Sequence, residues 1–270
     1  MGNKSRIDLL MVEKGLETSI ERAKALIMAG IVYVNGVKID KPGDEARPDV
    51  IIEVRGRKLN YVSRGGLKLE KAIKCFKLNL NEMICMDVGA STGGFTDCML
   101  QKGSKKVYAI DVGYGQLAWK LRTNERVVNL ERTNIRYLTK EQVPDLIDFF
   151  SVDISFISLT LALPVIKNLL CADAQGICLI KPQFETCREN VGKKGVVRDP
   201  AIHVMVIEKI VAFAIKEGFV VNGLDFSPVK GPEGNIEYLI YLKNSCQNAV
   251  EFIKIEEVVK NSHLQLSGGE

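Results

Sequence analysis

The stretch Ile84-Cys-Met-Asp-Val-Gly-Ala-Ser-Thr-Gly-Gly-Phe95 is the most informative part of this 270-residue chain for predicting its fold. An apolar run that contains one acid, Asp87, gives way to glycines, and a helical pattern follows from Phe95 to Gln101. This order predicts a strand, a tight loop and the N-terminus of a helix. Glycines let the backbone approach a ligand closely, and the first helical turn offers unpaired N–H groups. The stretch is therefore a candidate ligand-binding loop, although an ordinary strand–helix turn would leave the same pattern.

A second acid favours the ligand-binding interpretation. The next apolar run, Val107 to Ile110, is followed by Asp111. In an open parallel sheet, ligands bind at the carboxyl ends of the strands, and an acid after the second strand can hold a ribose. The glycine spacing is not the G-x-G-x-x-G of dinucleotide sites. Asp87 would repel a pyrophosphate but would suit the ammonium group of an amino acid, which favours S-adenosyl-L-methionine over NAD.

The segment from Leu67 onward alternates between apolar runs and helical patterns. Seven runs have the length of strands, and they cover residues 84–88, 107–111, 127–130, 146–152, 176–180, 219–226 and 236–243. A helical pattern over 160–170 precedes the fifth run, and a longer one over 201–216 precedes the sixth. Such alternation predicts an α/β fold, a Rossmann-like methyltransferase domain with a seven-stranded, mostly parallel sheet. The last two strands are expected to form a hairpin-like pair.

The first 60 residues predict a separate small α+β unit. A short amphipathic helix from Arg6 to Glu13 precedes a second helix, which is expected to begin at a capping box over Thr18–Glu21. Asn35-Gly36 between two alternating runs predicts a β-hairpin. So small a unit buries little core, which favours a binding module over an enzyme. Its charges alone fit a purely structural module equally well.

The junction between the two parts is strongly basic. From Arg55 to Lys77, eight lysines and arginines stand against Glu70 alone, a net charge of +7 over 23 residues, whereas the whole chain carries +4. This concentration is typical of a phosphate-binding surface, although a solvated helix face would also carry such charges. The candidate RNA-binding residues are basic side chains of the small unit and the junction: Arg6, Arg22, Lys24, Lys38, Arg55, Arg57, Arg64, Lys68 and Lys71.

Composition disfavours other classes of protein. The seven cysteines form no C-x-x-C pair and the chain has two histidines, so neither a disulfide framework nor a metal site is expected. The N-terminus lacks the pattern of a signal peptide, and no apolar run approaches the roughly 18 residues of a membrane span. A cytoplasmic protein without a membrane partner is expected. The sequence does not indicate an oligomeric state.

The small unit resembles a known RNA-binding domain. The segments Arg6-Ile-Asp-Leu-Leu10, Ser19 to Gly30 and Val34-Asn-Gly36 resemble the S-four-type (αL) domain, over roughly residues 5–55. The resemblance divides the chain into an RNA-binding domain at 1–58, an interdomain linker at 59–66 and a methyltransferase domain at 67–270.

Four polar residues stand out in the larger part. Asp153 and Lys181 close two predicted strands, Glu237 opens the last one, and Lys68 follows the junction. Each has an ordinary alternative as a helix cap or a solvated residue, but Asp153 and Lys181 would lie at the same edge of the sheet. Their order resembles the Lys-Asp-Lys-Glu tetrad of RNA ribose 2′-O-methyltransferases of the FtsJ type.

Six segments in order extend the resemblance to the TlyA family, also called haemolysin A, which joins both domains. They are Tyr61–Lys68, Asp87–Asp97, Asp111–Leu117, Glu131–Arg136, Asp153–Ser158 and Lys181–Glu185. One departure is Leu59-Asn-Tyr-Val62, where some relatives carry an Arg-x-Trp-Val run that is thought to couple the domains.

The resemblance implies methylation of cytidine 2′-hydroxyls in ribosomal RNA, with S-adenosyl-L-methionine as cofactor and ribosomal RNA or ribosomal subunits as partner. Lys181 would help to deprotonate the hydroxyl, and Asp153 and Glu237 would set the charge and position of this lysine. Lys68 would hold the RNA near the reacting centre. The cofactor would contact Asp87, Gly89, Ala90, Ser91, Thr92, Gly93, Gly94, Phe95, Asp111, Asn134 and Asp153. A non-catalytic RNA-binding protein and a haemolysin-like membrane-active protein are the alternatives.

Overall fold

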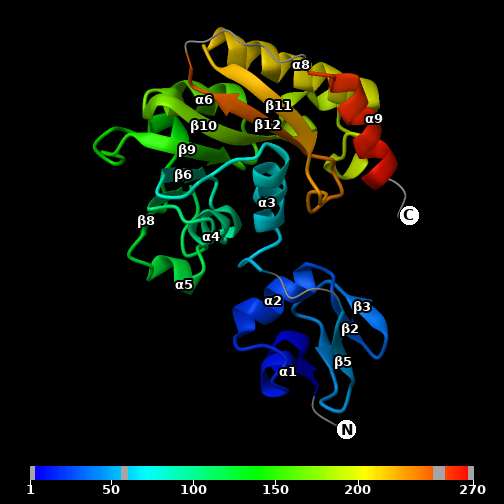
Figure 1. The fold of residues 1–270 in the computed structure, drawn as a ribbon. Coiled ribbons are helices and arrows are strands. Elements are labelled where there is room, and N and C mark those ends of the chain that lie inside the picture. Colours follow the sequence, from blue (N-terminus) through cyan, green and yellow to red (C-terminus); the bar gives the residue numbers. More distant parts are fainter. Residues whose placement is uncertain (1–3, 56–59, 246–252, 267–270) are drawn as a thin grey trace. The chain divides into compact units, whose positions relative to one another are not determined.

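The computed structural model describes residues 4–55, 60–245 and 253–266 (Figure 1). The chain forms two compact units, Met1–Gly66 and Leu67–Glu270. Within the described ranges, none of the helices has the length and apolar character that crossing a membrane requires.

The first unit packs two helices against a small antiparallel sheet. The helices are α1 (Ile7–Glu13) and α2 (Ile20–Met28), and the sheet has the order β3-β2-β5 with strands Val37–Ile39, Val32–Val34 and Ile52–Val54. A two-residue strand β1 (Ser5–Arg6) pairs separately with β4 (Glu45–Ala46). The apolar core consists of Ile7, Leu10, Met11, Ala23, Leu26, Ile27, Val32 and Ile52.

The predicted hairpin is confirmed, but the predicted cap of α2 is wrong by one residue. Asn35 and Gly36 both have positive φ angles, 49° and 81°, as a tight two-residue hairpin turn requires. The N-cap of α2 is Ser19, whose hydroxyl accepts a hydrogen bond from the backbone N–H of Arg22. The N–H of Thr18 instead donates to the carboxylate of Glu17, so Thr18 precedes the cap.

The second unit contains a seven-stranded sheet in the order β11-β12-β10-β9-β6-β7-β8. Strand β12 runs antiparallel to both of its neighbours, and β10-β9, β9-β6, β6-β7 and β7-β8 pair in parallel, which confirms the predicted mostly parallel sheet. In chain order the strands are β6 (Ile84–Val88), β7 (Lys106–Ile110), β8 (Val127–Leu130), β9 (Ile147–Val152), β10 (Leu170–Ile180), β11 (Val220–Phe226) and β12 (Tyr238–Lys243).

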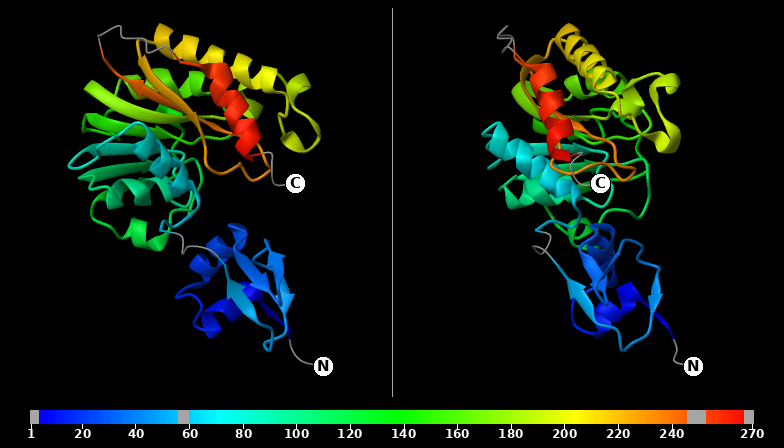
Figure 2. Two further views of the ribbon diagram at one scale, coloured as in Figure 1. Left: turned by 45° about the vertical axis from the view of Figure 1, so that its right-hand side comes forward. Right: turned by 90° about the vertical axis from the view of Figure 1, so that its right-hand side faces the viewer.

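Helices cover both faces of this sheet (Figures 1 and 2). On one face α6 (Leu159–Lys167), α8 (Pro200–Lys216) and α9 (Ile255–Leu266) contribute to the main apolar core, whereas α3 (Gly65–Cys75) and α4 (Gly94–Gln101) lie on the other. Short helices occupy the loops: α5 (Trp119–Arg122), η1 (Ile135–Tyr137), α7 (Pro182–Glu185), η2 (Arg188–Asn190) and η3 (Lys193–Gly195).

The boundary between α6 and β10 differs from the prediction. The apolar pattern predicts a helix as far as Leu170 and a strand from Gly176, but α6 ends at Lys167 and Leu170 already pairs with Ile147 of β9. The register shifts between Leu170 and Gln175, so the strand contains an irregularity. Backbone pairing across this bulge depends on the neighbouring strand, which the local sequence does not reveal.

The strand order brings the predicted site residues to one edge of the sheet. Strand β6 lies between β7 and β9. The chain continues from β6 to β7 and β8 on one side and then crosses to β9 on the other side, so the strand order reverses at β6. Ligands of open α/β sheets bind at such a switch point, beyond the carboxyl ends of the strands. Gly89, Asp111 and Asp153 directly follow β6, β7 and β9, and Lys181 follows β10.

Candidate active site

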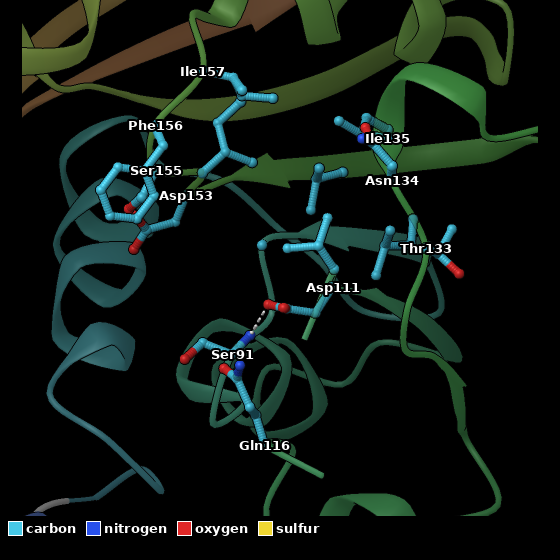
Figure 3. Close-up of a pocket in the computed structure, with 15 residues that line it drawn as sticks. Ser91, Asp111, Gln116, Thr133, Asn134, Ile135, Asp153, Ser155, Phe156 and Ile157 are labelled. Carbon is cyan, nitrogen blue, oxygen red and sulfur yellow. Dashed lines mark hydrogen bonds between the residues drawn. The ribbon is translucent and has the colours of Figure 1, made fainter. Parts of the chain in front are cut away.

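A cavity of about 440 Å³ opens at the carboxyl ends of β6, β7 and β9 (Figure 3). Figure 3 shows Asp153, Ser155 and Phe156 on one side of it and Thr133, Asn134 and Ile135 on the other. Its lining residues are Val88, Gly89, Ser91, Ile110, Asp111, Val112, Gln116, Thr133, Asn134, Ile135, Asp153, Ile154, Ser155, Phe156 and Ile157. We call this the first cavity.

Gly89 allows the loop after β6 to approach the end of β9. Its φ angle is +85°, and a Cβ atom added there would lie 2.5 Å from the backbone oxygen of Asp153. Any other residue here would be strained by the positive φ angle, and its Cβ atom would clash with Asp153. The close approach holds the glycine-rich loop beside Asp153.

Asp111 and Asn134 line the cavity in fixed orientations. The two carboxylate oxygens of Asp111 accept hydrogen bonds from the backbone N–H groups of Ser91 and Gly113, both at 2.7 Å. The side-chain oxygen of Asn134 accepts from the N–H of Arg136 and caps η1. The bond from Ser91 to Asp111 joins the loops after β6 and β7, and backbone bonds from Arg132 to Gly113 and from Thr133 to Asp111 add the loop after β8.

Asp87 lies behind the cavity and does not line it. Its Oδ2 accepts from the N–H and the hydroxyl of Thr96, and its Oδ1 accepts from the Ser151 hydroxyl at 2.8 Å. Burial raises the pKa of Asp87 to about 6, against the opposing effect of these hydrogen bonds. The carboxylate therefore joins α4 to β6 and β9, a structural role that differs from the expected contact with an ammonium group.

The other residues that were expected to contact the cofactor fall into two groups, those that line the first cavity and those that do not. Gly89, Ser91, Asp111, Asn134 and Asp153 line the first cavity, whereas Ala90, Thr92, Gly93, Gly94 and Phe95 are not among its lining residues. Gly93 is the N-cap of α4 in a left-handed conformation, with a φ angle of 93°. Its Cα packs so closely on α5 that an added Cβ would lie 2.2 Å from Leu121.

Asp153 forms the centre of a buried charge cluster. The Nζ atom of Lys181 lies 2.6 Å from Oδ1 of Asp153, and that of Lys68 lies 3.3 Å from Oδ2. Lys68 also donates to Oε2 of Glu237 at 2.6 Å. The exposed fraction of both lysine side chains is 9%, and that of Glu237 is 2%. The four residues that the sequence singles out, from four different segments, are thus brought together.

The cluster fixes the charges of two of its members. Burial opposes the charged form of Lys68, but the carboxylates of Asp153 and Glu237 outweigh it and raise the pKa of Lys68. Burial likewise opposes the ionised form of Asp153, but Lys68 and Lys181 outweigh it and lower the pKa of Asp153. Lys68 is therefore held as a cation between two carboxylates.

A second cavity, of about 320 Å³, adjoins the first. It is lined by Ser155, Phe156, Lys181, Gln183, Phe184, Gly195, Gly231, Pro232, Glu233, Asn235 and Glu237. Ser155 and Phe156 line both cavities. Asp153 faces the first cavity, and its partner Lys181 faces the second, so their ion pair lies where the two meet.

No role is assigned from the sequence to three residues in or near this junction: Phe156, Phe184 and Glu185. Phe156 is 86% exposed with a φ angle of 70°, and its ring lies 5.1 Å from that of Phe184. The buried carboxylate of Glu185 accepts from the hydroxyl of Ser158 and the N–H of Leu159, so it joins α7 to the start of α6. The segments Asp153–Ser158 and Lys181–Glu185 contain these residues, but only their charged first members suggested a function.

The expected RNA-binding residues divide between exposed and internal positions. Lys38 is exposed and Lys24 and Arg64 are partly exposed, whereas Lys68 lies in the charge cluster. Lys71 donates to the backbone oxygen of Phe226 at 2.6 Å, so it fastens α3 to β11. The remaining arginines pair with nearby acids: Arg6 with Asp8, Arg22 with Glu17, and Arg55 with Glu53. Arg57 lies outside the described residues.

Metal binding has no candidate cluster in the parts of the chain that the structure covers. Among those residues, no three or more histidines, cysteines, aspartates or glutamates are grouped to hold a metal ion.

Comparisons with known proteins agree with this architecture. Residues 61–244 match the FtsJ-like methyltransferase family, and residues 5–52 match the S4 domain. The chain is 53% identical to a Bacillus subtilis protein named "Putative rRNA methyltransferase YqxC", over 88% of this chain and 85% of that one. It is 38% identical to the 16S/23S rRNA (cytidine-2′-O)-methyltransferase TlyA of Mycobacterium tuberculosis, over the full length of both.

Solved structures lead to the same family. A "Putative hemolysin from Streptococcus thermophilus" superposes with a TM-score of 0.79 at 47% identity, over 99% of this chain and 98% of that one. The match to the methyltransferase family covers most of the chain, and full-length relatives share both domains. The chain therefore belongs to the FtsJ-like methyltransferase family, in the TlyA-type group that carries an S4 domain at the N-terminus.

Proposed function

We propose that this protein transfers a methyl group from S-adenosyl-L-methionine to the 2′-hydroxyl of a cytidine in ribosomal RNA. The observation that carries the proposal is the ion pair of Lys181 with Asp153, which joins two cavities. One cavity suits the methyl donor and the other suits the target nucleotide. The name of the mycobacterial relative, 16S/23S rRNA (cytidine-2′-O)-methyltransferase TlyA, supports the choice of substrate.

The residues of the first cavity fit the cofactor. Asp111 lies where a carboxylate can accept hydrogen bonds from ribose hydroxyls, and Val112, Ile135 and Ile157 supply apolar walls for an adenine ring. Asn134 offers an amide to the edge of the base. When it is bound, the cofactor supplies a methyl group on a positively charged sulfur, so alignment and proton removal remain for the protein to provide.

Lys181 is the proposed proton acceptor. Its Nζ contacts Asp153 and also donates to the hydroxyl of Ser155 at 3.1 Å, which holds it at the boundary of the second cavity. In its neutral form, the Lys181 amine would accept the proton of a 2′-hydroxyl placed in the second cavity.

Lys68, Asp153 and Glu237 position this amine. Lys68 joins the two carboxylates from the side opposite Lys181, so Asp153 presents only Oδ1 to the catalytic lysine. Lys68 is therefore a positioning residue in this proposal, and not the exposed phosphate contact that the sequence suggested.

The proposed partner is ribosomal RNA, either free or in a ribosomal subunit, in the cytoplasm. The S4 domain would contribute the exposed Lys38 and the partly exposed Lys24 to phosphate contacts, and the partly exposed Arg64, which follows that domain, would add a third. On the catalytic unit, the exposed ring of Phe156 offers a stacking surface to the target base at the mouth of both cavities.

Methyl transfer can be tested with purified protein, radiolabelled S-adenosyl-L-methionine and separate ribosomal subunits from a strain that lacks this gene. We expect label in alkali-resistant dinucleotides, because a 2′-O-methyl group blocks alkaline cleavage of the adjacent bond. Alkali-sensitive label would place the methyl group on a base and contradict the proposal. Absence of label from both subunits and from the free RNA extracted from them, with cofactor binding demonstrated, would also contradict it.

A further inference from the structure

Gln183 is a polar residue of the second cavity that has no role in the proposed chemistry. It lies in α7, two residues after the proposed proton acceptor Lys181, and it lines the same cavity. Its Oε1 atom is buried and has no hydrogen-bond partner among the residues that the structure describes. An unpaired buried carbonyl is unfavourable, so such an atom in a native protein calls for a ligand or another functional explanation.

The surroundings of Gln183 suit a flat, polar-edged ring. Phe156 and Phe184 supply aromatic surface on the same cavity, with ring centroids 5.1 Å apart. The other amide in the lining, that of Asn235, is already engaged: its oxygen accepts from the N–H of Val197 and its nitrogen donates to the oxygen of Gly195. Of the two lining amides, Gln183 is therefore the one whose oxygen has no partner among the described residues.

Two of the charged lining residues, Lys181 and Glu237, are also engaged, and the third, Glu233, is exposed. Lys181 pairs with Asp153, and Glu237 accepts from Lys68. A base that enters this cavity to bring its ribose to Lys181 meets aromatic surface and the unpaired carbonyl of Gln183. Enzymes that act on nucleotides taken out of a helix read the base by stacking and by hydrogen bonds to its Watson–Crick edge.

We propose that Gln183 is a specificity-determining residue that accepts a hydrogen bond from the exocyclic amino group of the target base. A cytosine presents this N4 amino group, whereas a uracil presents a carbonyl oxygen at the same position and would face the Gln183 carbonyl with a second acceptor. Gln183 thereby selects cytidine over uridine. This inference rests on the proposed function, since it names the base whose ribose Lys181 serves.

The experiment compares the wild-type protein with Gln183→Met, which has a similar length but neither a donor nor an acceptor of comparable strength. The substrates are ribosomal subunits with cytidine or uridine at the mapped target position. The readout is the ratio of kcat/KM for the two subunits. Gln183→Leu serves as a second apolar variant, and binding of S-adenosyl-L-methionine checks that each variant folds, because Gln183 does not line the first cavity.

We expect the wild-type kcat/KM to be at least about 10-fold higher for the cytidine subunit than for the uridine subunit. This is the discrimination that a hydrogen bond to a base edge typically provides. In Gln183→Met and Gln183→Leu the cytidine rate should fall by about 10- to 100-fold, with little change in the uridine rate. A variant that binds the cofactor and keeps the wild-type ratio would overturn the role of Gln183 alone. A wild-type protein that methylates neither subunit would overturn the proposed function, and this inference with it.

Discussion

The Nζ atom of Lys181 lies 2.6 Å from Oδ1 of Asp153, although the two residues belong to loops after different strands. The parallel pairing of β9 with β10 places these loops side by side. Because Asp153 lines one cavity and Lys181 lines the other, this ion pair couples the proposed cofactor site to the proposed nucleotide site.

Proton removal by Lys181 predicts that charge alone cannot replace it. In Lys181→Arg the positive charge beside Asp153 remains, but a guanidinium group does not release its proton in proteins. We expect both Lys181→Arg and Lys181→Ala to lower kcat by about 100- to 10,000-fold, the usual contribution of general base catalysis. Single-turnover methyl transfer measures this loss.

The control for Lys181 is cofactor affinity. Lys181 is not a lining residue of the first cavity, so titration calorimetry should give nearly unchanged binding of S-adenosyl-L-methionine in both variants. Wild-type turnover by Lys181→Arg would refute its role as proton acceptor.

The glycine at the end of β6 predicts a sharp steric effect. Gly89→Ala would add backbone strain at a φ angle of +85° and a clash with the backbone oxygen of Asp153. We expect a loss of about 2–4 kcal/mol in the free energy of unfolding and a strong loss of cofactor affinity. Gly115→Ala is the matched control, because its φ angle is +72° but no atom lies within 4 Å of the added Cβ. Equal losses in both variants, measured by chemical denaturation, would disprove the steric argument.

The exposed ring of Phe156 predicts a role in substrate binding. Stacking of one base on an aromatic side chain contributes roughly 1–3 kcal/mol, so Phe156→Ala should lower kcat/KM by about 10- to 100-fold. Stability should change little, because the ring is 86% exposed. Leu264→Ala, at a side chain on α9 that is 67% exposed, is the control and should keep wild-type kinetics. Phe156→Tyr should retain most of the activity, and a fully active Phe156→Ala would exclude stacking.

A buried histidine predicts a measurable loss of stability in mild acid. Burial lowers the pKa of His203 to about 4, although Val197 accepts a hydrogen bond from one ring nitrogen. The other ring nitrogen faces Tyr238 and His263, and the proximity of His263 lowers the pKa further. The unfolded chain, with a pKa near 6.5, therefore binds a proton more readily than the native protein.

The stability that neutral His203 contributes is complete above pH 6.5 and is lost as the pH falls toward 4, by up to about 3 kcal/mol. The raised pKa of Asp87 acts in the opposite sense between about 4 and 6, so the total pH dependence is not diagnostic. The difference in unfolding free energy between the wild type and His203→Gln removes the Asp87 contribution. That difference should shrink from pH 7 to pH 4, and a constant difference would contradict the prediction.

Local patterns in the sequence are enough to predict the order of the main strands and helices and to single out the residues of the charge cluster. Alternation of apolar runs with helical patterns depends on local periodicity, which survives without any tertiary information. Asn35-Gly36 specified its hairpin for the same reason, since both residues accept positive φ angles at low energetic cost. Lys68, Asp153, Lys181 and Glu237 were identified by their order and by resemblance, before any distance between them was known.

The position of each side chain and the groups that it contacts depend on the tertiary structure. Asp87 and Asp111 both mark strand ends, yet one is buried on Thr96 and Ser151 while the other lines the cavity, because the direction of a side chain depends on the packed neighbours. Lys68 was expected at an RNA surface, but Glu237, 169 positions away, draws it into the interior. The unpaired carbonyl of Gln183 is equally invisible in the sequence, because a missing partner is a property of the space around an atom.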